Sequence, residues 1–289
     1  MLDTPIKPML LQPSINIPNG ENYIHQVKWD GHRATLHYNN GKVKLFTRHG
    51  NDISFKYPEL CNIILPVENC ILDGEVIAFD QSASPPTPCF DNLIVRFQAS
   101  KKDKIAQLQQ TIPVHFSAFD ILYLNDRELT KLNLSQRLDI LEATITNNEF
   151  ISYSASYSDG EELFKKMVEL GMEGIVSKNL NKPYYIDSRP KDVFYKIKNY
   201  QYEVVTISAL RKNKFGWLMT NEEGKYKGVL EFVPPDERKA FYHISKQLIQ
   251  SENREYIYLN PLVKCKVKYQ CLSKNGLMRS ASFENFVLS

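Results

Sequence analysis

The sequence predicts an α+β protein of two domains that meet near residue 199. Residues 23–47 contain three short runs of β-forming residues separated by Asp-Gly and Asn-Gly, a pattern typical of antiparallel strands. Residues 135–171 contain two amphipathic helical patterns with capping residues. Beyond residue 199 the chain changes to short strands and one helix, which suits a small barrel. We therefore expect domains over residues 1–199 and 200–289.

Length and composition argue against a disulfide-rich, secreted or membrane-spanning protein. The 289 residues include 43% hydrophobic and 24% charged residues, which is ordinary for a globular protein with two cores. A net charge of +3 does not by itself indicate a nucleic-acid-binding protein. The five cysteines form no Cys-x-x-Cys pair, which favours reduced thiols in a cytoplasmic protein. No signal peptide or membrane span is predicted, so no membrane partner is expected.

The first three strands are expected at residues 23–29, 33–38 and 42–47, as one antiparallel meander. Lys28 ends the first strand and is followed by Asp-Gly and an arginine. A lysine amine is a nucleophile only when deprotonated, which burial or neighbouring cations favour. Lys28 is therefore either a covalent nucleophile or a surface lysine beside a hairpin turn.

Further charged and aromatic residues lie on or next to predicted strands. Arg48 follows the third strand beside a glycine, as a phosphate contact or an exposed loop arginine. The strand at residues 70–79 has Asp73 and Glu75 on one face, and two buried carboxylates require a cation or sugar hydroxyls. In the strand at residues 114–124, Phe119 is either a core ring or a platform on which a base stacks.

Two helices and two strands follow. Ser135 and Asp159 are expected to cap the helices, and residues 80–92 are expected to form a loop. Glu173 and Lys178, at the two ends of the strand at residues 172–178, lie on opposite faces and need separate partners. The strand at residues 194–198 has Lys196 and Lys198 on one face. Two such lysines repel each other unless an anion such as a phosphate lies between them. The alternative is a pair of solvated edge lysines.

The C-terminal segment is expected to contain five or so strands and one helix. In its last long strand, residues 262–272, apolar residues alternate with Lys264, Lys266 and Lys268. A lysine face of this kind neutralises backbone phosphates without reading sequence. The alternative is that the lysines protect a sheet edge from aggregation.

In order, the motifs are Lys-x-Asp-Gly-x-Arg, a loop arginine, Asp-Gly-Glu, an aromatic-Asp strand, Glu-Gly-Ile-Val-x-Lys and Lys-x-Lys. This order resembles the covalent nucleotidyltransferase superfamily, most closely the ATP-dependent DNA ligases. The resemblance covers nearly the whole chain, and its closest form is the ligase module of bacterial end-joining ligases. It implies an antiparallel-sheet, ATP-grasp-like nucleotidyltransferase domain followed by an OB-fold barrel that binds DNA.

The resemblance also implies a mechanism. Lys28 would attack the α-phosphate of ATP, forming lysyl-AMP; the AMP would pass to the 5′-phosphate of nicked duplex DNA, and the 3′-hydroxyl would displace it. Lys196 and Lys198 would stabilise the α-phosphate. Mg²⁺ or Mn²⁺ would be held by Glu173, Asp30 and Glu75. The nucleotide would be bound by Gln26, Arg33, Glu75, Phe119, Lys178 and Arg189, and the DNA by Arg48, Lys264, Lys266 and Lys268.

One departure from the family concerns the C-terminal part. Many members carry an Arg-x-Asp-Lys motif there that orients pyrophosphate, and residues 279–289 lack it. Lys274, Arg279 and Arg211 are the candidates to replace it. A monomer is expected. Two alternative functions stay open: an RNA ligase or GTP-using capping-type enzyme of the same superfamily, and a non-catalytic DNA-binding module.

Overall fold

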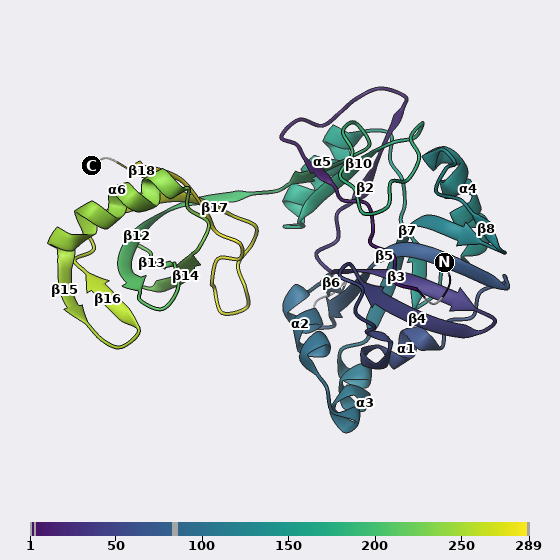
Figure 1. Ribbon diagram of the computed structural model, residues 1–289, viewed down its shortest axis with the longest axis horizontal. Coiled ribbons are helices and arrows are strands. Elements are labelled where there is room, and N and C mark those ends of the chain that lie inside the picture. Colours follow the sequence, from purple (N-terminus) through teal and green to yellow (C-terminus); the bar gives the residue numbers. More distant parts are fainter. Residues whose placement is uncertain (1, 3, 83–85, 288–289) are drawn as a thin grey trace. The chain divides into compact units, whose positions relative to one another are not determined.

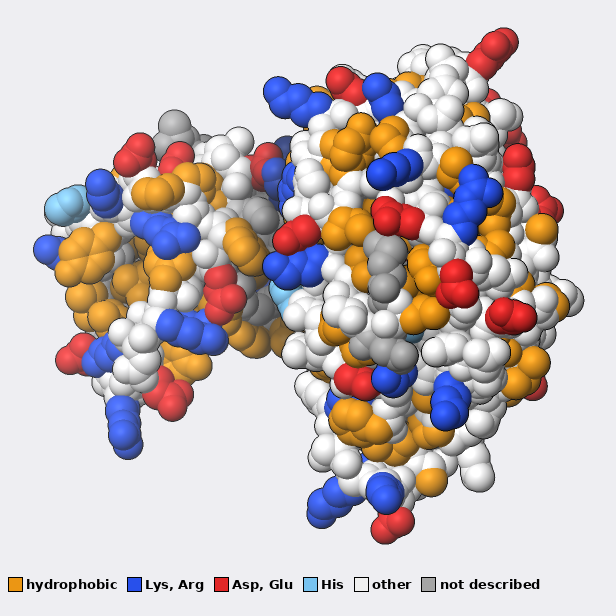
Figure 2. Space-filling view, turned by 45° about the vertical axis from the view of Figure 1, so that its right-hand side comes forward, with side chains coloured by type: hydrophobic (Ala, Val, Ile, Leu, Met, Phe, Trp, Pro, Cys, Tyr) orange, Lys and Arg blue, Asp and Glu red, His pale blue; other side chains and the backbone are white. Residues whose placement is uncertain are grey.

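The computed structural model describes residues 2, 4–82 and 86–287, and it forms two compact units, Met1–Lys198 and Asn199–Ser289 (Figure 1). None of the five cysteines, all of which lie in the described ranges, forms a disulfide. In the described ranges, no helix has both the length and the apolar character that crossing a membrane requires. On the face of the first unit drawn in Figure 2, lysine and arginine side chains are interspersed with aspartate and glutamate, in keeping with the small net charge.

The first unit contains a seven-stranded sheet in which β4, β3, β5, β7 and β8 lie in this order. β6 pairs with β5, and β9 pairs with β7. The strands are β3 (His32–Asn39), β4 (Lys42–Thr47), β5 (Asn69–Asp80), β6 (Thr87–Pro88), β7 (Val114–Leu124), β8 (Arg127–Glu128) and β9 (Ile151–Tyr153). The β7–β9 pair is parallel and the others are antiparallel.

A four-stranded sheet completes the strands of this unit, in the order β1 (Gln12–Pro13), β11 (Phe194–Lys198), β10 (Gly174–Asn179) and β2 (Tyr23–Val27). Its β1–β11 pair is parallel. The expectation of purely antiparallel sheets is therefore wrong: both sheets of this unit are mixed.

The predicted meander is also wrong, because β2 pairs with β10 and not with β3. The chain therefore crosses from one sheet to the other over residues 28–31. Gly31 permits the crossing, since a Cβ there would lie 2.5 Å from the carbonyl oxygen of Val76 and 2.6 Å from Cγ of Glu75. The Asp-Gly sequence is thus a crossover between sheets, and Lys28 lies where it begins.

The helices of the first unit pack against both of its sheets. They are η1 (Ser54–Lys56), α1 (Pro58–Cys61), α2 (Phe90–Gln98), α3 (Lys102–Thr111), α4 (Leu134–Thr144) and α5 (Gly160–Glu169). Asp159 caps α5 as predicted, because its Oδ1 accepts a hydrogen bond from the backbone N–H of Glu162 at 2.9 Å. Ser135 is not a cap; Asn133 and Gln136 form a capping box at α4 instead. The expected loop at residues 80–92 ends inside α2.

The core of the first unit lies mainly on the β3–β5–β7 surface, where Leu36, Leu72 and Phe116 are fully buried. Two buried ion pairs accompany this core. Arg96 Nη2 lies 2.8 Å from Glu59 Oε1, and Arg137 Nε lies 2.7 Å from Asp120 Oδ1. The first pair joins α2 to α1, and the second joins α4 to β7 of the sheet.

The second unit is a seven-stranded antiparallel sheet with one α-helix. Its elements are β12 (Gln201–Arg211), β13 (Trp217–Thr220), β14 (Tyr226–Leu230), α6 (Pro235–Ser245), η2 (Lys246–Leu248), β15 (Ile249–Glu252), β16 (Tyr256–Leu259), β17 (Lys264–Tyr269) and β18 (Ser282–Val287). The expectation of five or so strands missed β15, β16 and β18. Trp217 lies in the core, with ring centroids 4.6 Å from Phe241 and 6.1 Å from Phe283.

Candidate active site

Lys28 lies at the junction of the two sheets of the first unit. Its backbone N–H bonds to the Gly174 carbonyl at 2.9 Å, and its Nζ lies 2.5 Å from Glu173 Oε2. Lys198 Nζ lies 2.7 Å from the other carboxylate oxygen of Glu173. One carboxylate, 8% exposed, therefore bridges two ammonium groups from different strands.

The glycine after Glu173 has a structural role. Gly174 has a φ of +133°, and a Cβ there would lie 2.1 Å from the Ile197 carbonyl oxygen. Any larger residue would push β10 away from β11, which carries Lys198. The Glu-Gly sequence therefore allows the carboxylate to reach both lysines.

Lys196 adds a further cation to this group. Burial lowers its pKa, and the charges of Lys198, Lys28 and Arg189 lower it further. Its carbonyl accepts from the Ser14 N–H at 3.1 Å, but within the described chain its ammonium group makes no hydrogen bond or ion pair. Three ammonium groups thus gather around the Glu173 carboxylate, an arrangement that suits a bound polyphosphate.

Arg33, on β3, forms a bidentate ion pair with Asp73 on β5. Its Nε and Nη2 lie 3.0 and 2.7 Å from Asp73 Oδ1 and Oδ2. Although burial opposes the charged form, the charge of Asp73 raises the pKa of Arg33. This pair meets the predicted need for a cation beside the buried Asp73.

Glu75, two residues further along β5, lies in a different electrostatic environment. Burial raises its pKa to about 8, the nearby Glu173 and Asp73 add to the rise, and Lys28 and Arg33 oppose it. This carboxyl group therefore retains a proton near neutral pH until more positive charge arrives. A cation bound between Glu75 and Glu173 would supply that charge.

A cavity opens where these side chains meet, and both sheets contribute to it. Its wall consists of Leu11, Gln26, Val27, Lys28, Trp29, Arg33, Glu75, Phe119, Val176, Lys178 and Phe194. The Nε2 of Gln26 donates to the Ser154 carbonyl at 3.3 Å and contacts Ser156 Oγ at 3.1 Å. The carbonyl can only accept, which fixes the amide orientation. Gln26 Oε1 is then buried without a hydrogen-bond partner in the described chain.

Phe119 lines the cavity and is only half-buried, so its ring is not part of the core. The Lys178 Nζ lies 4.5 Å from the ring centroid and donates to the Phe119 carbonyl at 2.8 Å. Arg33 Cζ lies 5.3 Å from the same centroid. Burial lowers the pKa of Lys178 to about 7. Arg33 and Lys178 therefore both lie within cation–π distance of the ring.

Several predicted site residues lie apart from this cavity. Asp30 is half-buried in the crossover and is absent from the cavity wall, as far as the described residues show. Arg48 is exposed in the turn after β4, and Arg189 is exposed in the loop before β11, where Gln12 donates to its carbonyl at 3.2 Å. Arg211, a candidate for the pyrophosphate contact, pairs with Glu231 at 2.5 Å.

The lysine face of β17 has the predicted alternation, with Cys265, Val267 and Tyr269 buried. It is less cationic than expected, because Lys264 pairs with Glu222 at 3.1 Å and Lys268 with Glu284 at 2.6 Å. These glutamates come from a turn and from β18, and no local pattern predicts that they reach the lysines. Lys266 is exposed, and its Nζ lies 5.0 Å from the ring centroid of Tyr202.

The carboxylates near Lys28 fit a divalent metal ion in number and kind. In the described residues, no group of three or more His, Cys, Asp or Glu side chains converges as a preformed metal site. Mg²⁺ usually takes one or two carboxylates together with substrate phosphates and water. Glu75 and Glu173 form such a pair, close enough for the charge of Glu173 to raise the pKa of Glu75.

Comparison with known proteins identifies the family. The model of the ATP-dependent DNA ligase domain matches residues 8–198. The chain belongs to the ATP-dependent DNA ligase family. This ligase is also 34% identical over 284 residues to the SPbeta prophage-derived DNA ligase-like protein LigB of Bacillus subtilis, covering 97% of this chain and 98% of the relative. The sequence-based prediction of a DNA ligase is confirmed.

Other relatives share parts of the chain. The DNA ligase of Methanococcus maripaludis is 34% identical over 221 residues, 67% of this chain and 38% of that protein. Among solved structures, mycobacterial DNA ligase D complexed with ATP and MES matches with a TM-score of 0.59 and 21% identity, over 98% of this chain and 95% of that one. A Lig E DNA ligase matches with a TM-score of 0.66 and 19% identity, over 99% and 100%. The ligase shares their fold.

Sequence reasoning missed two parts of the site. Leu11 reaches the cavity because the segment expected to be an extended lead-in adds β1 to the edge of β11. The apolar run Met9-Leu10-Leu11 between prolines was the available signal. Tyr184, which bonds to Asp73, had no local signal because its partner lies 111 residues away in the sequence.

Proposed function

We propose that this ligase seals nicks in duplex DNA with ATP, through AMP carried on Lys28. The observation that carries the proposal is the position of the Lys28 amine. It lies in the cavity wall, 2.5 Å from a buried carboxylate and beside two further lysines. An amine in a positively charged cavity is suited to attack a phosphate ester, whose negative charge that environment favours.

The first step is transfer of AMP to the lysine. Glu173 Oε2 is the nearest acceptor for the Lys28 proton. The free amine forms a bond to the α-phosphorus of ATP, the bond from that phosphorus to the bridging oxygen breaks, and pyrophosphate leaves with the electron pair. Lys196 and Lys198 stabilise the charge on the pentavalent α-phosphate. Glu75 and Glu173, with Asp30 as a further candidate, would hold Mg²⁺ or Mn²⁺, which supplies charge neutralisation at the phosphates when bound.

The nucleotide would lie along the cavity wall. No described residue donates a hydrogen bond to Gln26 Oε1, and the exocyclic amine of adenine can do so. Guanine carries a carbonyl at that ring position, so the same atom would repel GTP. Phe119 would stack on the base, with Lys178 behind it, while Arg33 and Glu75 would bind the ribose. Arg189 would approach the phosphates.

The second unit would be an OB-fold that holds the DNA. On β12, Tyr202 is 54% exposed and pairs with Lys268 in the strand register, and Lys266 is the neighbouring lysine. Such a surface suits nucleic acid, because the lysines neutralise backbone phosphates and the exposed aromatic rings can stack on bases. Arg48, together with Lys264, would add phosphate contacts. We further propose that the active species is a monomer.

Labelling with radioactive nucleotide tests the proposal and separates it from the alternatives. The protein is incubated with Mg²⁺ and α-labelled ATP or GTP, and then with nicked DNA or nicked RNA. We expect label from ATP only and sealing of the DNA substrate. Label from GTP alone would indicate a capping-type enzyme, sealing of RNA alone an RNA ligase, and failure to seal even a pre-adenylated DNA nick a non-catalytic binding module.

A further inference from the structure

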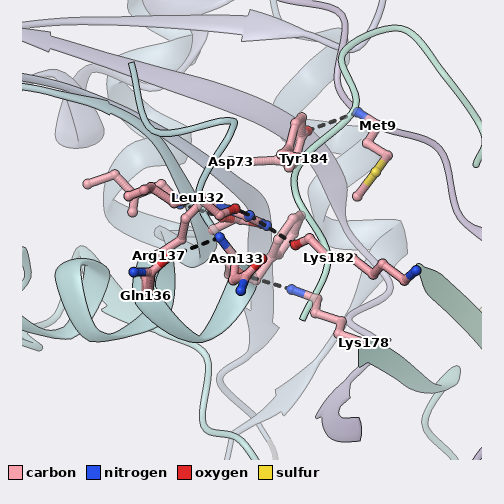
Figure 3. Close-up of polar contacts among 12 residues, drawn as sticks. Met9, Asp73, Leu132, Asn133, Gln136, Arg137, Lys178, Lys182 and Tyr184 are labelled. Atoms are coloured by element: carbon pink, nitrogen blue, oxygen red, sulfur yellow. Dashed lines mark hydrogen bonds and ion pairs between the residues drawn. The ribbon is translucent and has the colours of Figure 1, made fainter. Parts of the chain in front are cut away.

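The first unit contains a buried polar cluster around Tyr184, part of which is drawn in Figure 3. Two carboxylates form its base, and each binds a guanidinium through two bonds. Asp73 pairs with Arg33, and Asp120 pairs with Arg137 at 2.7 and 2.9 Å. Of these four residues, Arg33 alone lines the cavity. The cluster therefore holds the Arg33 guanidinium in the cavity wall through Asp73.

Tyr184 is the member of this cluster that connects the Arg33–Asp73 pair to the N-terminal segment. Its hydroxyl donates to Asp73 Oδ2 at 2.7 Å, accepts from the backbone N–H of Met9 at 2.9 Å, and lies 3.4 Å from Arg33 Nη2. The ring is 4% exposed. Burial and the charge of Asp73 raise the pKa of Tyr184, so the hydroxyl keeps the proton that it donates. Figure 3 shows Tyr184 between Asp73 and Met9.

The segment that carries Tyr184 is itself firmly held. The Tyr184 N–H bonds to the Thr130 carbonyl at 2.8 Å. Two groups of α4 bind the Lys182 carbonyl: the N–H of Leu134 at 3.1 Å and Nη1 of Arg137 at 3.3 Å. The backbone of this segment is therefore held in place by hydrogen bonds. Its Tyr184 hydroxyl gives Asp73, and through it Arg33, a fixed hydrogen-bond partner.

The bond from Met9 extends this support to the N-terminal segment. That segment also bonds to the loop after Tyr184, through Leu10 N–H to the Ser188 carbonyl at 2.8 Å. Leu11, in the same segment, lines the cavity. The hydroxyl therefore joins the N-terminal segment, which contains Leu11, to the Asp73 carboxylate that binds Arg33.

We propose that Tyr184 is a positioning residue of the nucleotide site, acting through the Arg33–Asp73 pair. The inference rests on the proposed function, because it takes Arg33 to be a nucleotide contact. Removing the hydroxyl leaves the buried Met9 N–H without its acceptor and takes one hydrogen bond from Asp73 Oδ2, the oxygen that also binds Arg33 Nη2. The guanidinium is then free to shift within the cavity wall, and the nucleotide loses a preorganised contact.

The test measures ATP binding in a Lys28→Ala background, where no AMP can be transferred to that residue. Tyr184→Phe retains the ring and its packing. We expect its Kd for ATP to rise about five- to tenfold, the effect of one misplaced hydrogen-bonding group. The matched control is Tyr57→Phe, a second buried tyrosine of the first unit whose hydroxyl has no partner in the described chain. Its Kd should stay within twofold of the parent.

A double-mutant cycle separates positioning from a general loss of structure. In an Arg33→Lys background, Tyr184→Phe should weaken ATP binding less than twofold, because the group through which it acts is already gone. An unchanged Kd in the single Tyr184→Phe variant, or a full additive loss in the Arg33→Lys background, overturns the inference.

Labelling of the wild type distinguishes failure of the inference from failure of the proposed function. A wild-type protein that forms no lysyl-AMP with ATP overturns both. A wild-type protein that forms it, together with unaltered binding by Tyr184→Phe, overturns the role of Tyr184 alone.

Discussion

Replacing Glu173 with glutamine changes one atom of the carboxylate that bridges Lys28 and Lys198, at 2.5 and 2.7 Å. The amide oxygen can accept from one ammonium, and the amide NH₂ then faces the other. Breaking a buried ion pair costs about 3–5 kcal/mol. Each lysine side chain is 18% exposed, so solvent screens part of this cost. We therefore expect Glu173→Gln to cost about 2–3 kcal/mol of interaction free energy at the site.

The loss should appear in the rate of lysine adenylation, because Glu173 holds the amine, is the nearest acceptor for its proton and is a proposed metal ligand. A barrier about 2–3 kcal/mol higher corresponds to a rate about 30- to 150-fold lower. The assay is single-turnover formation of lysyl-AMP with labelled ATP. Sealing of a pre-adenylated nick should be compared in the same variant.

The matched control is Glu59→Gln, which breaks the buried Arg96–Glu59 pair away from the cavity. It should lower the thermal midpoint with little effect on adenylation per folded molecule. An adenylation rate of Glu173→Gln within threefold of the wild type would refute the account of the Lys28–Glu173–Lys198 bridge.

Three further predictions concern pH, nucleotide choice and salt. The pKa of Glu75 is about 8 in the fold and ordinarily about 4.5, so the folded state binds this proton more tightly than the unfolded chain. The free energy of unfolding should therefore fall as pH rises from about 4.5 to 8, and Glu75→Gln should flatten this part of the profile in denaturant titrations. Gln26→Ala should raise the Kd for ATP about tenfold and reduce the preference for ATP over GTP, as measured by competition binding. Binding to nicked DNA should weaken steeply with salt; Lys266→Ala should reduce the slope of log K against log salt by about 1, and Lys264→Ala by less, because Glu222 already pairs with that lysine.

The sequence predicted the local features of the fold well. The bounds of β4 and β7 agree with the expected strands, and Asp159 caps the helix it was expected to cap. These features depend on alternation and capping, which lie within a few residues of each other. Family membership was also predictable, because it depends on the order and spacing of short motifs.

Features that depend on distant partners were not predictable. Asp-Gly after Lys28 carries the signal of a hairpin turn, and nothing nearby indicates that β2 pairs with β10. The β17 lysines alternate as predicted, but their pairing with Glu222 and Glu284 depends on a turn and a strand elsewhere in the second unit. The need of Asp73 for a cation was evident from its burial, whereas the support from Tyr184 required the tertiary structure.

The most direct test of the central claim is intact-protein and peptide mass spectrometry after incubation with ATP and Mg²⁺, on the wild type and on Lys28→Ala. We expect the wild type to gain one AMP, located on Lys28. Lys28→Ala should gain none, yet should still seal a nick that carries AMP beforehand. AMP on a different residue, or undiminished adenylation of Lys28→Ala, would contradict the assignment of Lys28 as the nucleophile.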